Sequence, residues 1–448
     1  MGTVSVSATA RPATAGQGAR ISVAFAALVL FFTVYCARPE DWLHFLAPIP
    51  LAKITGALAL VALLMTLGSL DRRRLPREML YVALLTAQLW LTVPFSPVWR
   101  GGAFWATLGF SKLLLILPMM LIAASTLPRL RGLIFVQAGS AALVAVVSII
   151  EQRRNVAMAG GRLFGAAGSF YDNPNELATA LAIALPFCLV FALRKNAGWR
   201  RWLWVLPMLA MVYTVFLTES RAGLLALVVS AGVCVWEFGV RGGRRYLPLL
   251  AAGAGLVLVL VAGKGLEERF AATFGSEVST QAEVTAYASA MERRALLTKS
   301  IEVSFQHPLF GVGLNNFEVI SGHWKVTHNS YTQLSAEGGF AALILFLMIL
   351  WRAFANLREA KQLANKDSEE YMWACALRAS LLGFVLASFF DSLAVVFFPY
   401  FLLGYTSILR ELVSSPETSG PKPVPEKRSP TSAGDLFRLG RTSTVSGA

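Results

Sequence analysis

Long apolar segments, separated by short polar ones, run along the chain from residue 21 to residue 412. A membrane-spanning helix needs roughly 20 mostly apolar residues. The expected spans are 21–37, 51–70, 78–95, 104–126, 132–151, 175–193, 202–218, 221–239, 246–262, 336–355, 372–390 and 393–411. The pattern therefore predicts an all-α polytopic membrane protein with about 12 transmembrane helices. The last two segments lie close together, so they either cross the membrane or form a re-entrant hairpin.

These helices divide the chain into five predicted parts. They are the N-terminus (1–20), helices one to nine (21–262), a long loop (263–335), helices ten to twelve (336–412) and a tail (413–448). The first part is polar and expected to be flexible. The loop contains MERRALLTKSIEVSF at 291–305, whose apolar positions favour a helix along the membrane surface. The tail is rich in Ser, Pro, Thr, Gly and Lys, a composition typical of disorder.

The charges indicate how the chain lies in the membrane. With the N-terminus inside, the cytoplasmic segments hold 25 of the 40 Lys and Arg residues, and the opposite side holds 12. Short cytoplasmic loops are typically basic, so both termini are expected in the cytoplasm and the long loop outside. The same distribution explains the net charge of +14. We expect no nucleic-acid partner, because no basic soluble domain exists to bind one.

Metal and nucleotide chemistry have no motif in this sequence. There is no HExxH, no other cluster of metal ligands and no Asp-x-Asp pair in an outer loop. The GKG at 263–265 lacks the first glycine of a Walker A motif. We therefore expect neither a metal ion nor a cofactor.

Two consecutive motifs carry a resemblance to a known family. HPLFGVGLNNF at 307–317, followed by THNSYTQLSAEGG at 327–339, resembles the O-antigen ligase/polymerase family of bacterial membrane glycosyltransferases. LTESRAG at 217–223 and YDNPNELA at 171–178 are further, weaker matches. The resemblance covers roughly residues 170–400.

The resemblance implies a fold, an activity and three site residues. Family members transfer a glycan from undecaprenyl pyrophosphate at the outer face of the inner membrane, and their fold is helical with a periplasmic loop over the site. Ligases transfer it to lipid A–core, and polymerases to another lipid-linked repeat. The family's histidine corresponds to His328 and its two arginines to Arg221 and Arg293, with Arg294 one position away from the second.

The chemistry of these residue types agrees with that activity. Arginine binds phosphate through two parallel hydrogen bonds and stays charged, so Arg221 and Arg293 suit a pyrophosphate donor. A neutral imidazole, with a pKa near about 6.5, can take the proton of a sugar hydroxyl, which makes His328 the candidate general base. Alternatively, the arginines contact lipid headgroups, and His328 merely adjoins a helix N-cap formed by Thr327 or Asn329.

Other polar residues have weaker assignments. Asn329, Glu337 and Asn175 are candidate supporting residues. The alternative role is to tie down a loop for Glu337 and to cap a helix for Asn175. Asp391 and Lys112 lie near or inside spans, where charges are often functional, but the sequence assigns neither a role.

Together these features favour an O-antigen ligase-like, metal-independent glycosyltransferase of the bacterial inner membrane, with its active site on the periplasmic side. Its expected partners are an undecaprenyl-pyrophosphate-linked glycan, lipid A–core or another glycan acceptor, and the lipid bilayer. An O-antigen or exopolysaccharide polymerase and a protein O-glycosylation ligase use the same chemistry and stay open. A lipid-linked glycan flippase is a fourth hypothesis. It predicts charged residues along a path through the spans rather than at the outer face.

Overall fold

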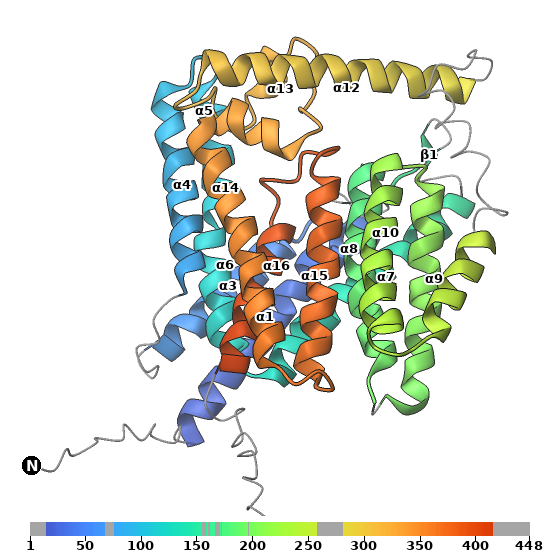
Figure 1. Cartoon of the computed structure of the whole chain (residues 1–448). Coiled ribbons are helices and arrows are strands. Elements are labelled where there is room, and N and C mark those ends of the chain that lie inside the picture. The colour runs from blue at the N-terminus through green and yellow to red at the C-terminus, as the bar shows by residue number, and fades with distance from the viewer. Residues whose placement is uncertain are drawn as a thin grey trace, which may run out of the picture.

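The computed structural model is a bundle of helices with a long helix lying across one end (Figure 1). It describes residues 15–67, 76–154, 158–159, 162–165, 171, 173–195, 197–257 and 281–414, with backbone alone for 15–21, 67, 158–159 and 281–286. The predictions for residues 1–14, for the tail beyond 414 and for 258–280 of the long loop lie outside the described residues.

The first half of the bundle is formed by helices that follow the apolar segments. In chain order they are α1 (Ala15–Ala37), α2 (Pro39–Trp42), η1 (His44–Leu46), α3 (Leu51–Leu67), α4 (Arg77–Phe95), α5 (Arg100–Ser111), α6 (Leu113–Ala123) and α7 (Leu127–Arg153). A short antiparallel pair of strands, β1 (Met158–Ala159) and β2 (Arg162–Leu163), follows.

The second half contains the long loop as well as further helices. These are α8 (Pro174–Leu193), η3 (Gly198–Arg201), α9 (Trp202–Leu217), α10 (Arg221–Cys234), η4 (Val235–Val240), an unlabelled helix (Tyr246–Val257), α12 (Gln281–Gln306), α13 (Phe317–Ile320), α14 (Ser330–Leu363), α15 (Glu369–Ala387) and α16 (Phe398–Ser414).

The prediction of an all-α polytopic membrane protein is confirmed. Within the described residues, eight helices are long and apolar enough to cross a membrane, and three shorter apolar helices match three further predicted spans. The predicted number of twelve stays a prediction. Of the last two segments, α15 has the length of a span, whereas α16 has 17 residues and is almost wholly buried from Phe398 to Leu409.

The helix α12 contains the stretch 291–305 and crosses the top of the bundle in Figure 1. We call this side of the molecule the α12 end. Leu296 and Val303 of α12 pack with Val312, Phe317 and Ala336 in a small apolar core that is separate from the main one. The hydroxyls of Ser304 and Ser335 lie 2.7 Å apart and join α12 to α14. These contacts hold the segment 307–329 between α12 and the bundle.

Helix α14 differs from the predicted span at 336–355, because it begins at Ser330 and is broken at Gly339. Gly339 has φ 78° and ψ 172°, a conformation that is essentially restricted to glycine. The Gln88 side chain donates to the carbonyls of Leu309 and Gly338, at 2.8 and 2.9 Å, and so holds the break against α4. The nine residues before the break form a separate short helix whose first turn positions the site described next.

Candidate active site

His328 directly precedes the N-cap of α14 and has a left-handed backbone conformation, with φ 50°. Positive φ costs a residue with a side chain free energy and clusters at functional sites. The cap itself is Asn329, whose Oδ1 accepts from the backbone N–H groups of Tyr331 and Thr332, at 3.0 Å each. Its Nδ2 donates to the carbonyl of Phe389 at 3.1 Å. Asn329 is therefore engaged in fixing the start of α14.

The loop between α15 and α16 is fastened to this helix start. The backbone N–H of Ser330 donates to the carbonyl of Ser388 at 2.8 Å, and its hydroxyl donates to the carbonyl of Asp391 at 2.7 Å. The hydroxyls of Thr327 and Ser392 lie 3.1 Å apart. These bonds bring Asp391 to His328, with 4.0 Å between His328 Nδ1 and Asp391 Oδ1.

Both members of this pair are poorly accessible to solvent. The side chain of His328 is 17% exposed and that of Asp391 is 1% exposed. Among the described residues, neither His328 Nδ1 nor Asp391 Oδ2 has a hydrogen-bond partner. Buried polar groups are nearly always paired in stable structures, so these two atoms are suited to bind a further polar group.

The charge environment keeps the imidazole neutral. Burial lowers the pKa of His328 to about 4, and the positive charges of Arg293 and Lys325 add to the effect while Glu292 opposes it. Burial of the ring beside a cation thus shifts the pKa of His328 below the ordinary value of about 6.5 that the sequence argument used. Burial raises the pKa of Asp391, against the opposing charge of Arg293.

Arg293 lies on α12 and is close enough for its charge to act on both His328 and Asp391. Its neighbour Arg294 is exposed, whereas Arg293 is half-buried. Next to it, Glu292 pairs with Lys325, with 2.6 Å between Oε1 and Nζ, which links α12 to the segment that leads into His328. Of the two adjacent arginines, Arg293 is thus the one placed toward the histidine.

Arg221 belongs to a second polar cluster, at the start of α10. Ser220 caps this helix by accepting from the N–H of Gly223 at 3.1 Å, and its hydroxyl donates to Asn175 Oδ1 at 2.8 Å. Asn175 Oδ1 also accepts from Arg162 at 3.0 Å. Asn173, not Asn175, caps α8. Asn175 therefore joins the starts of α8 and α10. Arg221 is the first residue of α10, so this contact helps to position it.

The cluster around Arg221 is built from α8, α9, α10 and β2, whereas that around His328 is built from α12, α14 and the α15–α16 loop. Arg162 of β2 reaches the carbonyl of Thr218 at 3.0 Å. The strand pair lies at the α12 end in Figure 1. Both clusters thus lie at one end of the bundle, and Arg293 is near enough to His328 for its charge to lower the pKa of the imidazole.

Glu337 fastens the segment 311–317 and does not face His328. Its side chain is buried, and it accepts from the N–H of Phe317 at 3.2 Å and from the Gln333 amide at 3.3 Å. Its backbone carbonyl accepts from the N–H of Gly313 at 2.9 Å. Lys112 is exposed at the junction of α5 and α6, away from these contacts.

Asp391 is the site residue to which the sequence assigned no role. Its one signal was a carboxyl group close to predicted spans, and its proximity to His328 arises only in the tertiary structure. No group of three or more His, Cys, Asp or Glu side chains that could hold a metal ion occurs in the part of the chain that the structure describes.

Comparison with known proteins gives a family match for part of the chain. Residues 206–347 match the O-antigen ligase family. This part of the chain is similar to that family, and the match covers about a third of the chain. The matched part contains Arg221, Arg293 and His328, whereas Asn175 and Asp391 lie outside it.

A curated relative supports the same family. The teichuronic acid biosynthesis protein TuaE of Bacillus subtilis (strain 168) is 27% identical over 192 residues. The alignment covers 40% of this chain and 39% of the relative. The resemblance to the O-antigen ligase/polymerase family is thereby confirmed, over less than half of either chain, in a multi-pass membrane protein.

Proposed function

We propose that this protein transfers a glycan from undecaprenyl pyrophosphate to an acceptor hydroxyl, that of lipid A–core, at the periplasmic face of the bacterial inner membrane. The observation that carries this proposal is the juxtaposition of a buried, neutral His328 with Asp391 and the charge of Arg293. The orientation with both termini in the cytoplasm is part of the proposal and rests on the distribution of Lys and Arg.

In the proposed reaction, His328 takes the proton of the acceptor hydroxyl as its oxygen attacks the anomeric carbon of the donor sugar. The new glycosidic C–O bond forms as the bond from that carbon to the pyrophosphate oxygen breaks. The pyrophosphate leaves with the bonding electron pair, and Arg293 and Arg221 stabilise its added negative charge. A single displacement of this kind inverts the configuration at the anomeric carbon.

The low pKa of His328 fits this scheme once the donor is bound. In the free protein the imidazole is neutral at pH 7 but a weak base, since burial and Arg293 disfavour its charged form. A bound pyrophosphate would place negative charge beside Arg293 and so remove part of the effect that lowers the pKa. The ionised Asp391 would then stabilise the imidazolium that forms on proton transfer.

The relative gives a reason to keep a second function. TuaE is named for teichuronic acid biosynthesis and not for lipopolysaccharide, which favours a polymerase that adds the glycan to another lipid-linked glycan. Ligase and polymerase would share the donor, His328 and both arginines, and they differ in the acceptor alone. The protein O-glycosylation ligase differs in the same way, whereas a flippase would not need a general base.

The decisive experiment is transfer by the purified protein from an undecaprenyl-pyrophosphate oligosaccharide, with and without lipid A–core, in the presence of EDTA. Product that requires lipid A–core supports the ligase. A ladder of longer lipid-linked glycans in its absence supports the polymerase. Transfer abolished by EDTA and restored by a metal ion would contradict the metal-independent scheme, and transport across vesicles without transfer would support the flippase.

A further inference from the structure

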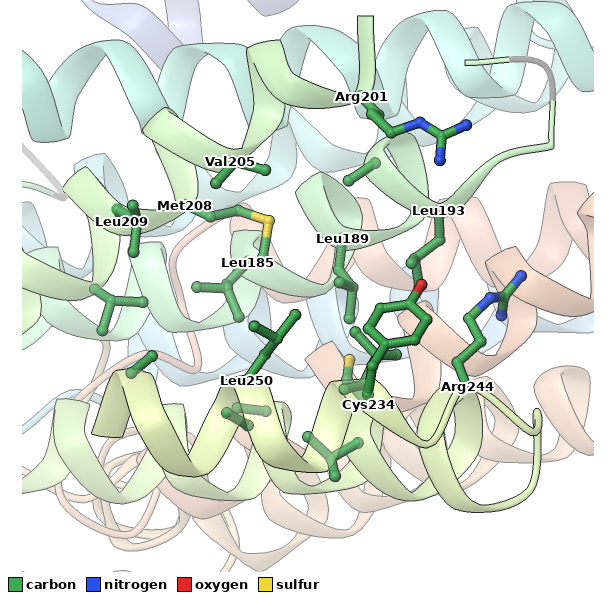
Figure 2. A pocket seen from close by; sticks show the side chains of 18 of the residues that line it. Leu185, Leu189, Leu193, Arg201, Val205, Met208, Leu209, Cys234, Arg244 and Leu250 are labelled. Atoms are coloured by element: carbon green, nitrogen blue, oxygen red, sulfur yellow. The ribbon is translucent and has the colours of Figure 1, made fainter. Parts of the chain in front are cut away.

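A lateral pocket lies in the second half of the bundle, between α8, α9, α10 and the helix Tyr246–Val257 (Figure 2). Its volume is about 600 Å³, within the roughly 300–1,000 Å³ that is usual for ligand pockets. Most of its wall is apolar. Leu185, Leu189, Met208, Leu209 and Leu250 are among the side chains that line it. A wall of this kind suits a hydrocarbon chain.

One end of the pocket is basic. Figure 2 shows the guanidinium groups of Arg201 and Arg244 on the same side, one on each of two facing segments, with Leu193 between them and the apolar side chains beyond. Arg194 and Lys195 line the pocket as well. Trp202 and Tyr246 also line it and are 65% and 51% exposed. Exposed tryptophan and tyrosine beside arginine are typical of the headgroup level of a membrane.

Two of these arginines are available to a ligand. Arg194 pairs with Glu369 at 3.2 Å. Arg201, by contrast, uses only its Nε, which donates to the carbonyl of Gly198 at 2.8 Å. Within the described ranges, neither Arg201 nor Arg244 has an ion-pair partner. The two guanidinium groups therefore present unneutralised positive charge at the mouth of an apolar pocket.

The pocket is remote from the candidate active site. Helix α8 has 20 residues, which is about 30 Å at 1.5 Å per residue. Its first turn holds Asn175 in the cluster around Arg221, and its last turn, with Leu193, lines the basic end of the pocket. The basic end thus belongs to the membrane leaflet opposite the α12 end. A polyprenyl donor whose pyrophosphate lies near Arg221 and Arg293 has its headgroup in the other leaflet, so this pocket is not the donor site.

We propose that the pocket is a specific site for an anionic phospholipid, with one acyl chain between α8, α9 and the helix Tyr246–Val257 and its phosphate between Arg201 and Arg244. Arginine binds phosphate through its planar fork, and the apolar wall continues from that point into the bundle. The site lies in the cytoplasmic leaflet if the membrane orientation given under the proposed function holds. The pocket, with its basic end and apolar wall, does not depend on the proposed reaction.

Native mass spectrometry of the purified protein in detergent, titrated with phosphatidylglycerol or phosphatidylcholine, tests this site. We expect the protein to bind phosphatidylglycerol more tightly than phosphatidylcholine. In the variant Arg201→Gln/Arg244→Gln, phosphatidylglycerol binding should weaken by roughly 25-fold, since each basic residue near a lipid surface contributes about 1 kcal/mol. Phosphatidylcholine binding should weaken less, because its choline cation already offsets the charge of its phosphate.

The matched control is Arg200→Gln/Arg245→Gln, which removes the same charge one position away from each arginine, at exposed residues outside the pocket lining. Equal weakening in both variants would overturn the proposal in favour of diffuse attraction to a basic surface. Leu250→Trp, at a 63% exposed lining position, should weaken binding by filling the pocket without a change in charge. Retention of full affinity in Leu250→Trp would exclude the chain from this pocket.

Glycerol phosphate has a phosphate headgroup without acyl chains. As a competitor, it shows whether the arginines bind a phospholipid or a free phosphate compound. It should not displace phosphatidylglycerol at millimolar concentration, and effective competition would mean that the arginines bind free phosphate compounds instead. Binding is read here without glycan transfer. A protein that binds the lipid but transfers no glycan would contradict the proposed function alone, and one that transfers glycan without a preference for phosphatidylglycerol would contradict this inference alone.

Discussion

His328 Nδ1 lies 4.0 Å from Asp391 Oδ1, although one residue precedes α14 and the other follows α15. The separation exceeds that of a hydrogen bond by about 1 Å, and Arg293 acts on both groups. A proton gained by His328 would give this pair opposite charges and draw it together. In the proposed reaction, this attraction would favour the imidazolium that forms when His328 takes a proton.

Removal of the carboxylate should change the pH profile of transfer. Burial raises the pKa of Asp391 to about 6, so wild-type kcat/KM should fall as the pH drops through that value and the carboxylate becomes neutral. In Asp391→Asn the carboxyl titration is absent. The imidazole of His328 has also lost a nearby negative charge, and this loss lowers the pKa of His328. The acid limb should move toward or below pH 4, where His328 gains its proton, and the plateau should be roughly tenfold lower, the equivalent of one pKa unit.

The profile of kcat/KM in the free protein between pH 4 and 8 checks this expectation. An acid limb at the same pH in wild type and Asp391→Asn would mean that Asp391 does not act through His328. A purely structural role would lower the plateau and leave the limb in place. Asp391→Glu keeps the charge and should restore part of the plateau.

Loss of His328 should remove the base without loss of the fold. His328→Ala should lower kcat by roughly 10²–10⁴-fold, the usual contribution of a general base, while donor affinity changes little. His323 is the matched control, because it is exposed in the same segment, and His323→Ala should keep full activity. Single-turnover transfer and donor binding, measured on the same preparations, separate the two effects. Equal activity of the two variants would refute the role of His328.

The two adjacent arginines of α12 should behave differently. Arg293→Gln removes the charge that acts on His328 and Asp391, and should lower kcat/KM by roughly 10²-fold or more, as loss of a group that stabilises developing charge does. Arg294→Gln changes an exposed side chain and should stay within about twofold of wild type. The reverse order of effects would show that the phosphate-binding arginine is Arg294.

The span prediction succeeded where the bilayer and the interior of the bundle together impose a continuous apolar stretch. The expected 78–95 and 175–193 became Arg77–Phe95 and Pro174–Leu193, because a helix in a bilayer must be apolar over its length and satisfies its own backbone. The histidine motif similarly made His328 a candidate from local sequence, and its role stays a prediction. The proximity of Asp391 depends on how the α15–α16 loop packs, and the lowered pKa of His328 depends on burial beside Arg293. Neither leaves a local pattern in the sequence.

The break at Gly339 also escaped the pattern, since it lies where the polar segment 327–337 leads directly into the apolar stretch that begins at Phe340. A Cβ at this position would lie 2.4 Å from the carbonyl oxygen of Leu309, in addition to the strained φ of +78°. Gly339→Ala should therefore destabilise the protein by roughly 3 kcal/mol or more, through backbone strain and a clash with fixed backbone atoms. The short helix that carries His328 at its start would lose its fixed position.

Gly322 supplies the control, because it also has positive φ, +74°, but a Cβ there would meet no atom within 4 Å. Gly322→Ala should lower the free energy of unfolding only through the strain of positive φ, by about 1–2 kcal/mol. The thermal unfolding temperature in detergent, measured together with transfer activity, compares the two variants. Gly339→Ala should have the lower unfolding temperature and little activity, whereas Gly322→Ala keeps activity. If both substitutions lower the unfolding temperature equally, the packing of Leu309 against the break does not hold the site in place.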